Sequence, residues 1–362
     1  MAGESVEEAM EAVGLSEDAG HDLRLDQATF FRCVKDGNLH SLQALLNNRK
    51  LDVNAYNEDG VTALHLAVYE YEQRRNLEIA ETLIKHGANV CLKAAATRST
   101  HKVAFVRHDS KKLHSDTLLA TKKVDFDQKP PLLIALELKS SLYLKGWEYR
   151  HWDAMLLLLA DASLKYYTNK GVRATTVARD VFVDVQEGWE SVFHSEKHEL
   201  VEIWAEGKHL VALKLLLTSA SKILKLNIEA ENAATSLSSR IELKDASFNI
   251  VKIMVRFIYI GKVEPQLMVQ RGIDIFLASH KYGVESLKAL CEAEIVATQE
   301  NWIKLLSAAT DCDSEILAVK CADSIKRTME LRQENTTFFK RSFSESLDAP
   351  GQLFHGPGNS SS

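Results

Sequence analysis

The sequence predicts two folds in one chain: an N-terminal array of paired helices, then a mixed α/β domain with a short helical extension. Two observations support this. A turn-and-helix phrase recurs along the first half of the chain, as it does in proteins built from stacked repeats. In the second half, a predicted strand pair (200–205 and 208–212) is followed by segments with apolar residues at helical spacing.

The clearest repeat unit runs from Asp59 to Val90. Gly60 supplies a free backbone in its turn, Thr62 caps the first helix, and Gly87 ends the second. The phrase Thr62-Ala-Leu-His65 resembles the signature of an ankyrin repeat, with Ala63 where that family usually has Pro. The resemblance implies that His65 bonds within and between repeat turns, which makes it a structural residue.

Looser copies flank this unit. They lie at residues 30–46 (a helix pair with Asp-Gly-Asn in its loop), 130–135, 152–162 and 169–178, the last resembling the opening of a capping repeat. We therefore expect about three ankyrin repeats plus a capping fragment over residues 25–180, with insertions at 92–128 and 140–150. The insertion at 93–123 is basic and is expected to be either a solvated loop or a patch for an acidic partner. Within it, residues 103–106 favour one strand of a small hairpin.

The second half carries a different resemblance. The phrase Ile253-Met-Val-Arg-Phe-Ile-Tyr-Ile-Gly-Lys-Val263, the pair Cys291-Glu292 and the helices between them resemble a BTB/POZ domain, a module that recruits proteins. The resemblance implies a BTB-like domain at 199–297, preceded by a linker at 181–198 and followed by a helical extension at 298–332. An acidic N-terminus (1–24) and a tail (333–362) are expected to be disordered.

The BTB resemblance also implies a partner. Members of that family bind a cullin-3 scaffold through an exposed loop, here residues 224–232, together with a neighbouring helix. The residues that would form this surface are Ile228, Glu229, Glu231 and Tyr282. For Tyr282, packing in a seam between helices is an equal alternative. Leu213 and the missing Ser-Asp-Val opening depart from the family pattern in the region tied to dimer packing, so homodimerisation stays open.

The sequence contains no enzyme signature. Dinucleotide-binding and phosphate-binding glycine loops, the nucleophile elbow and the zinc-protease motif are all missing. Thirteen histidines and five cysteines show no ligand spacing. We therefore expect no catalytic residues, no cofactor and no metal.

Composition restricts the partners and the compartment. The net charge of −6 argues against a general nucleic-acid binder, and no apolar run approaches the ~20 residues that cross a bilayer. The acidic N-terminus does not resemble a signal peptide. Five scattered cysteines are typical of reduced thiols in the cytoplasm or nucleus.

Two functions follow as alternatives. In one, the chain is an adaptor whose ankyrin repeats recruit a target and whose BTB domain couples that target to a cullin-3-type ubiquitin ligase. In the other, the chain is a scaffold or co-regulator that assembles partners without ubiquitin transfer. The pattern Lys340-Arg-Ser342-Phe-Ser344 adds a candidate kinase site in the tail.

Overall fold

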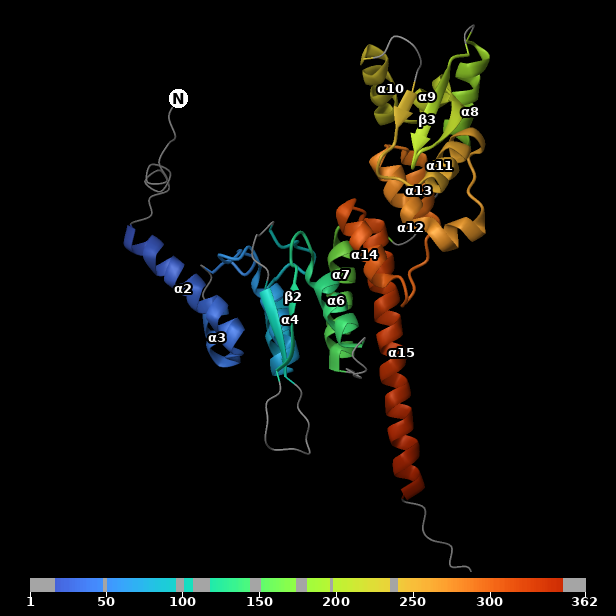
Figure 1. The fold of residues 1–362 in the computed structure, drawn as a ribbon. Helices are drawn as coiled ribbons and strands as arrows, with labels where there is room; N and C mark the ends of the chain where they lie inside the picture. Colours follow the sequence, from blue (N-terminus) through green and yellow to red (C-terminus); the bar gives the residue numbers. More distant parts are fainter. Residues whose placement is uncertain are drawn as a thin grey trace, which may run out of the picture.

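Three helix pairs stack side by side in the N-terminal half of the computed structural model (Figure 1). The structure describes residues 17–47, 51–95, 101–106, 118–143, 151–173, 181–195, 198–234 and 240–347. The pairs are α2 (Glu17–Asp36) with α3 (Leu39–Leu46), α4 (Ala63–Arg74) with α5 (Leu77–Lys85), and α6 (Pro131–Tyr143) with α7 (His151–Asn169). First helices contact first helices, and second helices contact second helices. The predicted array of helix pairs is confirmed.

Local residues set the turn inside each of the first two pairs. Gly37 and Arg75 adopt left-handed backbone conformations, with φ of +70° and +51°. Each is followed by an asparagine, Asn38 or Asn76, whose side chain accepts a backbone N–H in the first turn of the next helix. Such a cap satisfies one of the backbone donors that a helix start leaves without a partner.

The basic insertion contains a strand pair. Strands β1 (His101–Val106) and β2 (Leu118–Val124) pair antiparallel, so these residues form strands and not an irregular loop, and the strand favoured at 103–106 is present. Residues 96–100 and 107–117 lie outside the described part of the chain. The second insertion is described only up to Tyr143, where α6 ends.

The second half is a small sheet covered by helices. In order they are α8 (Val181–Phe193), β3 (Leu200–Ala205), β4 (Lys208–Leu213), α9 (Lys214–Ala220), α10 (Lys222–Ala234), β5 (Arg240–Glu242), α11 (Phe248–Ile260), α12 (Pro265–Lys281) and α13 (Glu285–Glu294). Strand order is β4-β3-β5, with β4 antiparallel and β5 parallel to β3. Val201, Ile203 and Ala205 are buried, while the side chains between them are partly exposed. This alternation is that of a strand with one face on the core.

Helix α8 replaces the expected linker at 181–198. It packs against α9, and the indole Nε1–H of Trp189 donates to the Tyr259 carbonyl at 2.9 Å. The Tyr259 hydroxyl in turn accepts the Leu213 N–H at 2.7 Å. These bonds tie α8 to α11 and β4, so α8 is part of the α/β domain.

Helices α14 (Trp302–Asp311) and α15 (Glu315–Leu347) are the last two in the described part of the chain. They form the expected helical extension, but α15 continues through residues 333–347, where disorder was expected. Residues 17–24 are likewise helical, because α2 begins at Glu17. Residues 1–16 and 348–362 are not described.

Candidate functional site

His65, which was predicted to be a structural residue of the repeats, forms hydrogen bonds within its own repeat and to the next one. The Nδ1 atom of His65 accepts from Thr62, whose Oγ1 lies at 2.7 Å and whose backbone N lies at 3.3 Å. The opposite ring nitrogen, Nε2, lies 3.0 Å from the Lys129 carbonyl of the following repeat. These partners select the neutral tautomer with the proton on Nε2. Burial lowers the pKa of His65 to about 4, so the ring is neutral at neutral pH.

The two glycines occupy turns. Gly60 has φ of +71°, and its carbonyl accepts the Ala95 N–H at 2.8 Å. Gly87 has φ of +92°, and its carbonyl accepts from Asn54 of the preceding repeat at 3.1 Å. Asn54 also accepts the Asn89 N–H at 2.7 Å. The sequence contains the signal for this contact, because both asparagines lie in the recurring phrase at 52–55 and 87–90.

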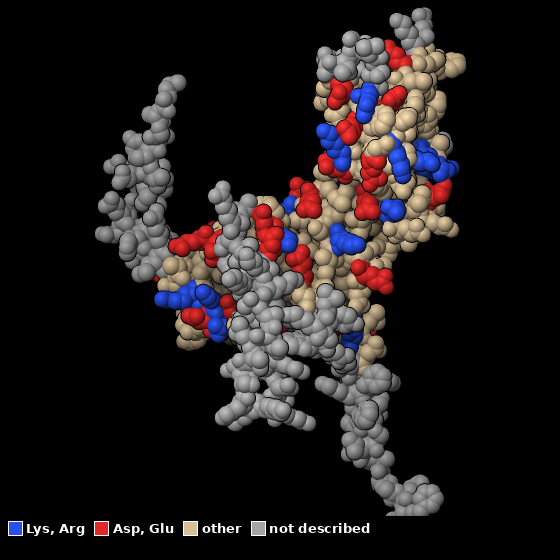
Figure 2. All heavy atoms as spheres, in the orientation of Figure 1, with Lys and Arg blue, Asp and Glu red and all other residues tan. Residues whose placement is uncertain are grey.

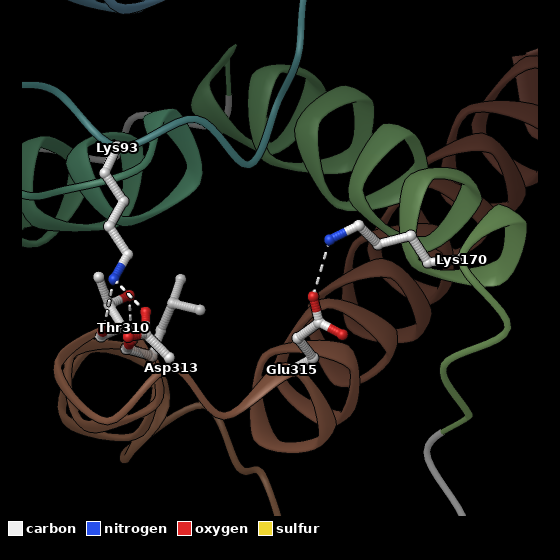
Figure 3. A network of polar contacts seen from close by, with 6 residues as sticks. Lys93, Lys170, Thr310, Asp313 and Glu315 are labelled. Atoms are coloured by element: carbon white, nitrogen blue, oxygen red, sulfur yellow. Dashed lines mark hydrogen bonds and ion pairs between the residues drawn. The ribbon is translucent and has the colours of Figure 1, made fainter.

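The outer face of the third helix pair is covered by α14 and α15 of the same chain. Helix α14 lies against α6, and α15 runs along α7 (Figure 1). We call this interface of α6 and α7 with α14 and α15 the seam. Two lysines of the repeat array bind across it, as Figure 3 shows. Lys93 Nζ donates to the Thr310 carbonyl and to Asp313 Oδ1, both at 2.6 Å. Lys170 Nζ lies 2.9 Å from Glu315 Oε1.

Further along α15, ion pairs continue across the seam. Lys326 Nζ lies 2.5 Å from Asp161 Oδ1 of α7, and Arg332 lies 3.5 Å from Asp153. Hydrogen bonds from Lys165 and Lys326 lower the pKa of Asp161. Asp153 also pairs with Lys139, whose pKa is lowered by burial. The sequence does not reveal the contacts of Lys326 and Arg332 with α7, because their partners lie more than 150 positions away in the chain.

A partly open cavity of about 230 Å³ lies between the two lysine contacts. Its lining comes from both sides, with Cys91 and Tyr167 from the array and Ala318 from α15 among the contributors. Burial raises the pKa of Cys91 to about 11 and also raises that of Tyr167, so both groups are protonated at neutral pH. The volume is below the ~300 Å³ at the lower limit of common ligand pockets.

The residues predicted for a cullin surface divide into two groups. Residues 224–232 form part of helix α10, so the predicted loop was wrong. Ile228 is 0% exposed and Tyr282 5% exposed, whereas Glu229 and Glu231 are exposed. Burial raises the pKa of the Tyr282 hydroxyl. The outward face of α10 also carries Leu226, which is 64% exposed.

Charges of both signs are interspersed on the face shown in Figure 2, with no broad area of one sign among the described residues. Within the described part of the chain, no group of three or more His, Cys, Asp or Glu is arranged to hold a metal ion. Over the same residues, no helix is both long and apolar enough to span a membrane.

Two family models match the chain. The model for the BTB/POZ domain matches residues 192–326, and a model for ankyrin repeats in three copies matches residues 5–94. The first therefore starts near the end of α8 and continues through α14 into α15. The second ends before α6, so the third helix pair, expected from the copies at 130–135 and 152–162, lies outside that match.

Curated relatives and a solved structure match a smaller part. The chain is 32% identical over 126 residues to BTB/POZ and TAZ domain-containing protein 1 of Arabidopsis thaliana, covering 33% of this chain and 34% of the relative. It is 32% identical over 109 residues to TD and POZ domain-containing protein 3 of Mus musculus, covering 30% and 28%. The chain thus spans about a third of these relatives. The BTB domain of human gigaxonin is 18% identical, covers 33% of this chain and 96% of that chain, and has a TM-score of 0.25.

Stacked helix pairs bonded from turn to turn, a three-stranded sheet under helices and the two family matches all agree. Ankyrin repeats and BTB domains are both protein-interaction modules. The chain is an ankyrin-repeat protein with a C-terminal BTB/POZ domain.

Proposed function

We propose that this protein is a substrate-recruiting adaptor. Its ankyrin array binds a target, and its BTB domain presents that target to a cullin-3-type ubiquitin ligase in the cytoplasm or nucleus. The observation that carries the proposal is the presence of two interaction modules in one chain, matched at residues 5–94 and 192–326. A stack of ankyrin helix pairs presents an extended surface suited to protein recognition.

On the BTB side, we assign the cullin contact to the outward face of α10. Leu226 and Glu229 are exposed there, and Glu231 is exposed three residues after Ile228, near the end of the helix. Ile228 instead packs inward with Leu224, one helical turn before it, and both are 0% exposed. The contact we propose therefore keeps the two glutamates, replaces Ile228 by Leu226 and leaves Tyr282 in the core.

Binding of the full chain to the purified N-terminal domain of cullin-3 tests this assignment. We expect Leu226→Asp and Glu229→Lys each to weaken binding at least about tenfold, as is typical when a central interface contact is lost. Leu331→Asp is the matched control, because Leu331 is an equally exposed leucine (60%) on α15. We expect the control to bind like the wild type.

Two outcomes would count against the adaptor function. Absence of binding by the wild-type chain at micromolar concentration would contradict the cullin coupling. Binding that Leu331→Asp weakens as much as Leu226→Asp would contradict the assignment to α10. Circular dichroism on each variant shows that the fold is retained.

A scaffold without ubiquitin transfer is the second candidate. The burial of Ile228 and Tyr282 favours it, because half of the residues first assigned to the cullin surface are held in the core. Full activity in cells of a variant that no longer binds cullin-3 would select the scaffold. Sedimentation of the full chain would show whether either function involves a homodimer.

A further inference from the structure

We propose that α14 and α15 act as the terminal repeat of the ankyrin array, supplied by the segment that follows the BTB domain. The array and the BTB domain then form one body that presents its partner surfaces at a fixed angle. This inference concerns the geometry and the folding of the chain, and it holds whether or not the protein binds cullin-3.

The stacking pattern is the first observation. Along the array, α2 contacts α4 and α4 contacts α6, while α3 contacts α5 and α5 contacts α7. The same rule continues past the third pair, because α6 contacts α14 and α7 contacts α15. In Figure 1 the α14–α15 pair occupies the position of a fourth pair.

The turn between α14 and α15 is the second observation, since it repeats the turns within the array. Asp313 adopts a left-handed conformation with φ of +50°, as Gly37 and Arg75 do. The next residue is Ser314, whose Oγ accepts the Leu317 N–H at 3.4 Å. Its backbone N–H donates to Ala309 O at 2.8 Å, in the same relation as the bond from Asn38 to the Cys33 carbonyl at 2.9 Å.

The outer face of α7 requires such a cover. The side of α7 that carries Asp153 and Asp161, the partners of α15, also carries Leu157, Ala160 and Leu164 at helical spacing. Ala160 is 0% exposed and the two leucines are partly buried in the chain as folded. The terminal repeat of an ankyrin array needs a polar outer surface to stay soluble. The capping fragment expected at 169–178 does not supply one within the described residues, because α7 continues to Asn169 and the description ends at 173.

Helix α15 supplies the complementary face. Ala318, Ala322, Ile325 and Met329 are buried and lie on the side of the helix that carries Glu315, Lys326 and Arg332, the three residues paired with α7. Apolar burial along the centre of the seam, flanked by ion pairs, resembles the core and rim of a stable interface.

The α14–α15 pair also forms hydrogen bonds with the BTB domain. The Ser314 hydroxyl donates to Glu292 Oε1 of α13 at 2.7 Å, and Lys320 Nζ donates to the Ala293 carbonyl at 2.6 Å. Helix α14 contacts α12 as well. The pair therefore lies between the array and the BTB domain, and motion of one relative to the other would break contacts on one of its sides.

Amide hydrogen exchange on the full chain tests the inference. We expect Ala322→Glu to increase exchange across α6 and α7 by at least about tenfold, because a charge buried in the seam opens it. Leu331→Glu places the same residue at an exposed position of the same helix, and we expect it to leave exchange in α6 and α7 unchanged.

A charge exchange keeps the test decisive if Ala322→Glu prevents folding. We expect Lys326→Asp, which faces Asp161, to increase α7 exchange about fivefold, and the added change Asp161→Lys to restore it. The inference is overturned if α15 alone exchanges faster in Lys326→Asp while α6 and α7 keep their protection. Loss of cullin binding in the earlier assay would leave this result untouched.

Discussion

His65 is the residue whose protonation should most affect the stability of the array. Its ring is fully buried, accepts from Thr62 and donates to Lys129 O. Protonation would place a second N–H against the Thr62 N–H and charge a desolvated ring. The native pKa of about 4 lies below the unfolded value of 6.5. The stabilisation is therefore complete above pH 6.5 and is lost as the pH falls toward 4.

We predict that the wild-type chain loses about 1.4 kcal/mol of unfolding free energy through His65 between pH 7.5 and 5.5. Urea unfolding at the two pH values measures this loss. His65→Gln, which does not titrate, is the comparison and should lack this part of the pH dependence. Equal pH dependence in both proteins would mean that His65 is as easily protonated in the folded state as in the unfolded state.

Among the single residues predicted for the cullin surface, residue type alone did not distinguish exposed from buried positions. The pair Ile228-Glu229 has the composition of a contact site, and Tyr282 lies in a family phrase. The side of α10 that faces the core buries Ile228 and leaves Glu229 exposed, while Tyr282 is buried at the end of α12. A spacing of four between Leu224 and Ile228 was the available signal, and it indicates a helix with an inward face at this position.

At the scale of the element, Ser314 determines how α15 begins. Its side chain is almost fully buried, caps α15 and donates to Glu292. We predict that Ser314→Ala costs about 1–2 kcal/mol, because the helix loses its cap and a carboxylate loses a donor. Urea unfolding measures the change. Ser191→Ala on the exposed side of α8 is the control and should stay within about 0.5 kcal/mol of wild type.

Elements were predictable where their pattern was local. The helices at 63–74 and 77–85 follow from capping and glycine residues within a few positions of each end. Helix α8 and the continuation of α15 beyond residue 332 were missed. The packing of α8 on α9 and its bond to Tyr259 come from distant parts of the chain.

For the whole molecule, we predict that apolar packing stabilises the interface of α14 and α15 with α6 and α7 more than its ion pairs do. The pairs formed by Lys93, Lys170 and Lys326 are all partly exposed, and such pairs contribute little and are screened by salt. Raising the salt from about 0.1 M to about 1 M should therefore lower the unfolding free energy by less than about 1 kcal/mol. Urea titrations at both ionic strengths check this. A loss of several kcal/mol of unfolding free energy at the higher salt concentration would mean that the ion pairs, and not the apolar packing, stabilise this interface.

The sequence by itself determined that the chain consists of ankyrin repeats followed by a BTB/POZ domain. Both assignments rest on short-range patterns, such as the phrase at 62–65 and the one at 253–263, and local propensity and periodicity are readable along a chain. Only the tertiary structure decided that Lys93 pairs with Asp313 and that Ala318 and Tyr167 line the same cavity. Contacts between residues more than two hundred positions apart, or between two apolar helix faces, depend on which surfaces remain uncovered once each module has folded.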